Sequence, residues 1–217
     1  MSETTALGLS ARTGAVMVGF TVIFTAVMAY TYEATKTQIA ASASEEKMKL
    51  LTEVLPATAY DNALLDDYVQ LGPTGELGLD DGGRIYRARK AGQPVALLIE
   101  SVAPDGYSGR IELIVAVRAD GSLSGVRAVA HRETPGLGDY IDPKKDKNKK
   151  SPWITQFGEL KAADIPGCKV KKDGGQITYH TGATISARAV TNAVARAARY
   201  ATEHQDRLFA AKSGGPL

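Results

Sequence analysis

A run of 20 residues without a formal charge, 13–32, constrains this chain more than any other feature. Arg12 precedes the run, Glu33 follows it, and its centre is apolar. At about 1.5 Å per residue, a helix of this length spans roughly 30 Å, the thickness of a hydrocarbon core. Tyr30 and Tyr32 lie near one end, where amphipathic aromatic side chains favour the interface. The run predicts a single transmembrane helix near the N-terminus.

A cleaved signal peptide is the competing interpretation of the same run. Residues 41–43, Ala-Ser-Ala, resemble a cleavage site, but they lie too far beyond the apolar run, which is also long for a signal. We therefore expect an uncleaved anchor. Arg12 precedes the anchor and Glu33 follows it, so the positive-inside rule favours a cytoplasmic segment 1–12. In a bacterium, residues 33–217 would then lie in the periplasm.

The segments after the anchor predict an antiparallel sheet on a helical stalk. Residues 33–56 form the expected stalk, because 34–55 have an apolar side at helical spacing and Pro56 ends the pattern. Alternating and apolar stretches follow, and Asp120-Gly121 is a hairpin signal. In 110–117, before that hairpin, apolar residues alternate with other residues, as in a strand with one buried face. In chain order, the expected strands are 84–89, 95–102, 110–117 and 125–130, followed by a second β section near 170 and at 176–179.

A long helix is expected at the C-terminal end, over 186–208. Its small apolar residues recur at spacings of three and four, so one face can pack closely on a sheet. Residues 213–216 are expected to form a frayed tail. The fold class is therefore α+β: an antiparallel sheet with packed helices in a domain over 57–212, on a single N-terminal transmembrane helix.

Composition excludes several functions. The net charge is only +2, which gives no support for binding nucleic acid. Cys168 is the single cysteine, so the chain has neither an intramolecular disulfide nor a Cys-x-x-Cys metal motif. Three scattered histidines, His131, His180 and His204, do not have the spacing of a metal site. Redox chemistry in this chain would need an organic cofactor.

A lysine-rich segment, 142–152, has two interpretations. It contains Lys144, Lys145, Lys147, Lys149 and Lys150. A charged run is most often a solvated loop. The alternative is a contact with acidic lipid or with an acidic partner protein of a complex.

The first segment with chemical potential is Glu133-Thr134-Pro135-Gly136-Leu137-Gly138, directly after a predicted strand. Proline fixes its own φ, while the two glycines accept positive φ and have no Cβ. Such a loop lets backbone approach a flat ligand, with the leucine as an apolar lid, although a purely structural tight turn has the same composition. Trp153 is likewise either a core aromatic or a stacking platform.

The second segment is Thr181-Gly182-Ala183-Thr184-Ile185-Ser186, directly before the long helix. A hydroxyl before a helix is usually an N-cap. The same geometry suits a phosphate, because the first N–H groups of a helix lack partners and the macrodipole is positive there. A threonine hydroxyl is a poor nucleophile without a neighbouring base, so a covalent link to a phosphate would need a separate enzyme.

The order of these elements resembles the family of FMN-binding G subunits of Rnf electron transport complexes. The shared elements are the anchor, the 133–138 loop, Trp153, and the Thr-Gly-Ala-Thr segment before a helix. The resemblance implies FMN joined by a phosphoester to Thr184, with 133–138, Thr181, Gly182, Ala183 and Ser186 around it. It also implies a flavin transferase that supplies FMN from FAD. The chain would be an electron carrier that works with the other subunits of an inner-membrane, ion-translocating complex for ferredoxin/NAD oxidoreduction. No independent substrate site and no metal are expected.

One position departs from that pattern. The family motif usually has Asp three residues before its first Ser or Thr, and this chain has Thr178 there. Three alternatives remain open. They are the C subunit of the sodium-pumping NADH:quinone reductase, a flavin sensor, and a membrane-anchored tether without redox chemistry.

Overall fold

A single helix, α1, runs from Glu3 to Val54. The structure, a computed structural model, describes residues 3–217. The predicted transmembrane run and the predicted stalk helix are one element, because neither Gly nor Pro occurs between Phe20 and Leu55. Pro56 follows the helix end, as predicted.

The chain forms two compact units, one that ends at Lys47 and one that spans Met48–Leu217. In the first unit, the apolar side chains of α1 are exposed on all sides; Val16, Phe24 and Met28 are examples. Among residues 3–217, α1 alone is long and apolar enough to cross a membrane. A helix that is apolar all round and uncovered by protein has the surface of a membrane span. The expected boundaries at 33, 57 and 213 and the cytoplasmic place of 1–12 stay predictions, and residues 1–2 lie outside the described residues.

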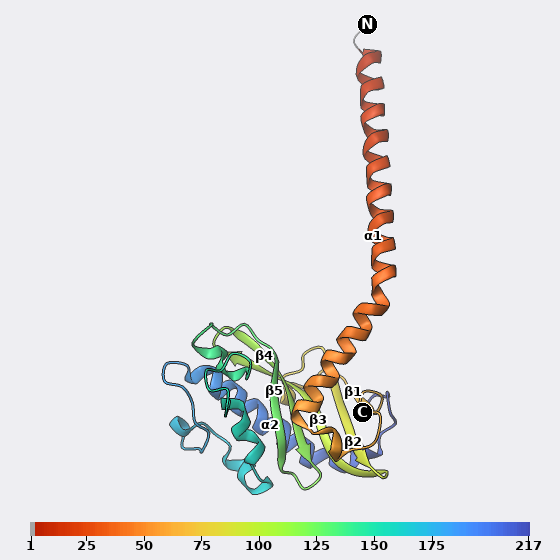
Figure 1. Ribbon diagram of the computed structural model, residues 1–217. Coiled ribbons are helices and arrows are strands. Elements are labelled where there is room, and N and C mark those ends of the chain that lie inside the picture. The colour runs from red at the N-terminus through yellow and green to blue at the C-terminus, as the bar shows by residue number, and fades with distance from the viewer. Residues whose placement is uncertain (1–2) are drawn as a thin grey trace. The chain divides into compact units, whose positions relative to one another are not determined.

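The second unit is built on a five-stranded antiparallel meander in the order β1-β2-β3-β4-β5 (Figure 1). Each of the four strands predicted first is present and longer than expected, and β1 was not among the strands expected from the sequence. The central pairing places Leu98 opposite Ala116 and Ile99 opposite Val115. The strands are β1 (Tyr68–Leu71), β2 (Gly83–Lys90), β3 (Gln93–Gly106), β4 (Gly109–Arg118) and β5 (Leu123–Ala130).

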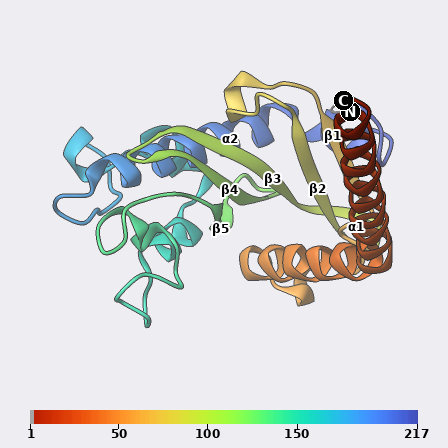
Figure 2. The same ribbon diagram turned by 90° about the horizontal axis from the view of Figure 1, so that it is seen from above.

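Both faces of the sheet are covered, which corrects the expected half-buried strand. Leu113 and Val115 of β4 belong to the larger core, beneath helix α2 (Thr184–Ala210). Ile114 on the other face packs in a second core with Leu51, at the end of α1. Figure 2 shows α2 on one side of the sheet and the last turns of α1 on the other. Burial on both faces explains why the strand carries apolar residues at nearly every position.

Helix α2 begins at Thr184, two residues before the predicted start. Its predicted small face is confirmed, since all five members of the face are buried: Ala187, Val190, Val194, Ala197 and Ala201. Two arginines of β2 bind its C-terminal carbonyls: Arg87 Nη1 donates to Leu208 O at 3.0 Å and Arg89 Nη2 to Phe209 O at 2.7 Å. Cations at the negative end of a helix stabilise it.

The predicted second β section is wrong. Only an isolated bridge joins Val170 to Ile177, and the segment consists of short 3-10 turns: Trp153–Glu159, Ala162–Gly167 and Lys171–Asp173. At the Gly174-Gly175 pair the chain reverses direction too sharply for two paired strands to form. Gly174 has φ of +83°, and a Cβ at Gly175 would lie 2.0 Å from Lys169 O.

The C-terminal tail does not fray. Gly214 N donates to Tyr68 O at 2.8 Å, and Gln70 N donates to Gly215 O at 3.0 Å. The tail therefore satisfies the free edge of β1, which would otherwise leave backbone donors and acceptors unpaired.

Cys168 lies in the larger core and is buried. Burial raises the pKa of its thiol to about 11, because an apolar environment disfavours the thiolate.

Candidate functional site

The structure brings the two predicted segments together through Glu133 and Ser186. Ser186 Oγ, in the first turn of α2, donates a short hydrogen bond to Glu133 Oε2. Glu133 Oε1 accepts from Ser108 N at 2.9 Å, at the β3–β4 hairpin. Both side chains are almost sealed from solvent, with 3% of Glu133 and 1% of Ser186 exposed. One carboxyl group thus joins the hairpin, the loop after β5 and the start of α2.

Gly138 allows this junction to close. A Cβ at this position would lie 2.4 Å from Ser186 Oγ and 2.6 Å from Glu133 Oε2, closer than side-chain carbons approach. The loop before it is tight as well: Gly138 N donates to Thr134 O at 3.2 Å, and Gly136 N to Asp139 Oδ1 at 2.8 Å. Gly136 has φ of +76°, in the left-handed region that favours glycine. Gly136 thus has the expected positive φ, and Gly138 has the expected need for a missing Cβ, while the approach of this loop to a flat ligand stays a prediction.

The segment before α2 is held at both ends by aromatic side chains. At its start, Trp153 Nε1 donates to Thr178 O at 2.6 Å. At its end, Tyr140 Oη donates to Ala183 O at 3.1 Å, and the Tyr140 ring stacks on His180 with centroids 3.9 Å apart. Burial raises the pKa of Tyr140 to about 12, so the phenol stays neutral and keeps its donor. Trp153 is buried, so the interpretation as a core aromatic is correct.

Thr178 is fixed by a neighbouring amide. Its backbone N–H and its Oγ1 both donate to Gln156 Oε1, at 2.9 and 3.1 Å. Gln156 Nε2 in turn donates to Trp153 O at 2.8 Å. The threonine that stands where the family pattern has Asp is thus part of a hydrogen-bonded junction.

Thr184 is the first residue of α2 and is half-buried. The N-cap is Ala183, which provides no side-chain cap, so neither Thr181 nor Thr184 is the capping residue that one interpretation of the sequence suggested. Within residues 3–217, the hydroxyls of Thr134, Thr181 and Thr184 have no hydrogen-bond partner in the protein. The first N–H groups of α2 also lack a side-chain acceptor. An uncapped helix start with a free hydroxyl at its first position fits a phosphate bound there.

Exposed apolar side chains lie beside this junction. Tyr107 is 67% exposed, Leu137 52% and Ile185 46%, and each is one residue away from Ser108, Gly138 or Ser186. They come from three separate segments that Glu133 joins. Apolar side chains around the polar start of a helix suit a ligand with a flat ring system and a phosphate. The sequence prediction included Leu137 but missed Tyr107 and Tyr140; the Gly-Tyr-Ser-Gly turn between two strands was the available signal for Tyr107.

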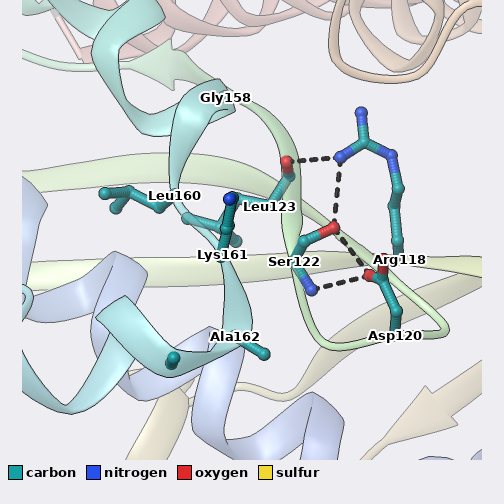
Figure 3. A pocket seen from close by; sticks show the side chains of 9 residues that line it. Arg118, Asp120, Ser122, Leu123, Gly158, Leu160, Lys161 and Ala162 are labelled. Atoms are coloured by element: carbon teal, nitrogen blue, oxygen red, sulfur yellow. Dashed lines mark hydrogen bonds between the residues drawn. The ribbon is translucent and has the colours of Figure 1, made fainter.

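Two hollows lie near the sheet, in different places. One of about 310 Å³ borders the segment before α2 and is lined by Asp146, Trp153, Gln156, Thr178 and His180 among others. The other, of about 460 Å³, lies beside the β4–β5 turn (Figure 3), where Arg118 Nη1 donates to Leu123 O at 2.8 Å. Leu123 begins β5 and Glu133 follows the end of that strand, so the second hollow is a strand length away from the Glu133 junction.

Comparison with known proteins agrees with this geometry. The FMN-binding domain family matches residues 106–199, which include Tyr107, Glu133, Thr184 and Ser186. The RnfG N-terminal region matches residues 9–54, almost the whole of α1.

Three relatives are similar over nearly the full chain, and each is the G subunit of an ion-translocating oxidoreductase complex. That of Pseudoalteromonas atlantica is 40% identical over 205 residues, covering 94% of this chain and 93% of the relative. That of Shewanella oneidensis is 40% identical, covering 91% of this chain and 92% of the relative. That of Pseudomonas aeruginosa strain UCBPP-PA14 is 42% identical, covering 88% of each.

Fold and site define an FMN-binding α+β domain on a membrane-type helix. The chain belongs to the family of G subunits of ion-translocating oxidoreductase complexes, which confirms the family expected from the sequence.

Proposed function

We propose that this chain is an electron carrier whose FMN is joined through its phosphate to Thr184 Oγ1. The observation that supports the proposal most directly is a hydroxyl without a partner at the first position of α2, inside the region that matches the FMN-binding domain. When bound, FMN supplies the electron-accepting and electron-donating chemistry. The protein supplies position and surroundings, so no separate substrate site is required.

The residues around Thr184 would divide the work of holding FMN. The N–H groups of Thr184, Ile185 and Ser186 would stabilise the negative phosphate at the helix start. Gly182 has φ of +89°, and a Cβ placed on it would meet nothing within 4 Å, so the backbone there leaves room for the ligand. Loop 133–138 would lie against the flavin, with exposed Leu137 as its apolar contact.

Attachment would be catalysed by a flavin transferase. Thr184 Oγ1 would attack the FMN phosphorus of FAD, lose its proton and displace AMP, so that one phosphoester forms as the pyrophosphate bond breaks. A free threonine hydroxyl needs a base for this step, and an external enzyme would provide it. The transferase needs access to Thr184, which the exposed neighbours Thr181, Gly182 and Ile185 permit.

The remaining partners and the orientation follow from the family and the anchor. We infer that the chain assembles with the other subunits of an ion-translocating oxidoreductase complex. Residues 13–32 would contact lipid in the bacterial inner membrane, with 1–12 in the cytoplasm and the flavin domain, 57–212, in the periplasm. The family match favours this role over the C subunit of the sodium-pumping NADH:quinone reductase, over a sensor and over a tether.

The mass of one peptide tests the attachment. Full-length protein from cells with an active transferase is digested, and the peptide that contains Thr184 is expected to be heavier by one FMN. Thr184→Ala should abolish the modification and the flavin fluorescence of the denatured protein, whereas the control Thr58→Ala, at an exposed position outside the FMN-binding match, should retain both. An unmodified wild-type peptide, or modification on Thr181, would refute the proposal.

A further inference from the structure

The lysine-rich segment accounts for the net positive charge of the chain. Residues 142–151 contain five lysines and two aspartates, a net charge of +3, while the whole chain has a net charge of +2. The remainder is therefore close to neutral. We call Lys144, Lys145, Lys147, Lys149 and Lys150 the lysine surface; all five are exposed.

Buried polar groups give this segment a defined backbone. Asp146 is buried, and its two oxygens accept from Asn148 N at 2.9 Å and Trp153 N at 2.6 Å. Asp142 Oδ1 accepts from Lys144 N at 2.9 Å. Because Asp146 accepts from two backbone N–H groups and Asp142 from one, these carboxylates hold the loop in shape while the lysines stay exposed. A surface that is organised in advance costs less entropy when a partner binds.

The charges of the lysine surface are not neutralised within the protein. Among residues 3–217, none of the five lysines forms an ion pair. The only contact of a lysine head group there is the bond from Lys149 Nζ to Lys144 O, at 2.6 Å. Five like charges within seven residues repel one another, so the surface presents a concentrated positive potential.

The lysine surface borders the proposed FMN site on two sides. On one side, Asp142 Oδ2 at the start of the loop lies 4.0 Å from His131 Nε2, and His131 Nδ1 accepts from Glu133 N at 3.2 Å. On the other side, Asp146 of the same loop shares a hollow with Thr178 and His180 of the attachment segment. In Figure 2 the loop projects from the domain, away from α2. A molecule docked on the lysines would therefore lie beside the flavin.

We propose that the lysine surface docks an acidic protein that exchanges electrons with the FMN of this chain. The inference rests on the proposed function. One electron would pass from the partner, which is oxidised, to the flavin, which is reduced. Charged patches next to a redox centre speed encounter without requiring a large interface. The segment 144–150 contains no aromatic or apolar residue, so it lacks the second signal that surface binding to a bilayer generally uses.

The test uses the full-length, flavinylated protein in detergent and two probe proteins of opposite charge. A reduced, acidic plant-type ferredoxin serves as electron donor, and basic cytochrome c serves as acceptor from the reduced flavin. The variant Lys144→Gln/Lys147→Gln/Lys150→Gln removes three charges from the surface. The matched control Lys49→Gln/Lys161→Gln/Lys212→Gln removes three lysines elsewhere.

For wild type, the bimolecular rate with ferredoxin is expected to fall as salt rises, and that with cytochrome c to show no such fall. The surface variant should lose about tenfold of the ferredoxin rate at low salt, within the range of electrostatic steering, while the control loses less than about twofold. Equal losses in the two variants, or no loss in either, would overturn the proposal.

Three further measurements separate this proposal from others. Loss of FMN from the surface variant, seen in the Thr184 peptide mass, would indicate a transferase-docking surface and contradict the inference. Loss of binding to vesicles containing phosphatidylserine, with unchanged ferredoxin kinetics, would indicate a lipid contact and also contradict it. An absence of FMN from wild-type Thr184 would instead refute the proposed function on which this inference rests.

Discussion

Ser186 and Glu133 are 53 positions apart in the chain, yet they share a buried hydrogen bond that joins the start of α2 to the loop after β5. Thr184, two residues earlier in the same turn, is placed by this contact. The bond thus fixes the position of the proposed attachment hydroxyl relative to the loop expected to face the flavin.

Ser186→Ala should destabilise the domain by about 2 kcal/mol, because it leaves one oxygen of a buried carboxyl without its donor. Urea unfolding of the full-length protein in detergent measures the change. Ser151→Ala, at an exposed position, serves as the control and should change the free energy of unfolding by less than about 0.5 kcal/mol. Equal stability of the two variants would show that the Ser186 bond contributes nothing.

Gly138→Ala should cost about 1–3 kcal/mol, since its Cβ would overlap Ser186 Oγ and Glu133 Oε2 and force the junction apart. FMN content should fall with it, because the loop and the helix start would separate. Gly167→Ala is the matched control, as a Cβ there meets nothing within 4 Å. Thermal unfolding and flavin absorbance check both effects; normal stability in Gly138→Ala would contradict the close approach.

Arg87→Ala should cost about 2–3 kcal/mol. Arg87 is buried, pairs with Asp67 and donates to Leu208 O at 3.0 Å, so truncation removes a buried partner of that carboxylate and a donor to the end of α2, although Arg89 still pairs with Asp67. Arg110→Ala removes an exposed arginine that lies 3.7 Å from Glu112 and should cost less than about 1 kcal/mol. Chemical denaturation distinguishes the two, and a small effect at Arg87 would refute its role at the helix end.

Stability should decrease as pH falls through the histidine range, in part because of His131. Burial, and then the charge of Lys145, lower the pKa of His131 in the folded state. The unfolded chain therefore binds the proton more readily, so the contribution is complete above the usual pKa of about 6.5 and declines below it. His131→Gln should flatten the fall in unfolding free energy between about pH 7.5 and 5.5. An identical pH dependence in wild type and His131→Gln would contradict the assignment.

Gln156→Ala should lower FMN loading at Thr184, because Thr178 loses the acceptor for both its N–H and its hydroxyl and the attachment segment loosens at its start. The fraction of modified Thr184 peptide measures the effect. Gln176→Ala, at an exposed position two residues before Thr178, is the control and should load normally. Full loading in Gln156→Ala would mean that the transferase does not depend on this junction.

Local patterns predicted the parts of the fold that depend on local physics. Alternation and turn signals identified the four longer strands, and small residues at helical spacing identified the buried face of α2. The short strand β1 has only 4 residues and is defined by its neighbour and by the tail at its edge, neither of which is visible in its own sequence. Likewise, a sharp chain reversal at Gly174-Gly175 stands where a strand was expected. The backbone conformation of the two glycines decided the local structure there, and the side-chain pattern did not.

The site shows the same division. The two motifs were recognisable as segments, and the structure explains Gly138 and Ser186 through one contact with Glu133. The partners Ser108, Tyr140 and Gln156 could not be predicted, because each lies on another element that only the folded sheet brings near. Thr178 appeared in sequence as a plain departure from a pattern, and its hydrogen bonds to Gln156 give it a structural role.

The sealed position of Cys168 has a practical consequence for spectroscopy. With its sulfur in the core and the pKa of the thiol at about 11, it offers almost no thiolate to maleimide or nitroxide reagents at neutral pH. The native chain should therefore be labelled hardly at all by these reagents. A single cysteine introduced on the lysine surface would then carry the reporter group. The distance from this spin label or fluorophore to the flavin could be measured while a partner binds.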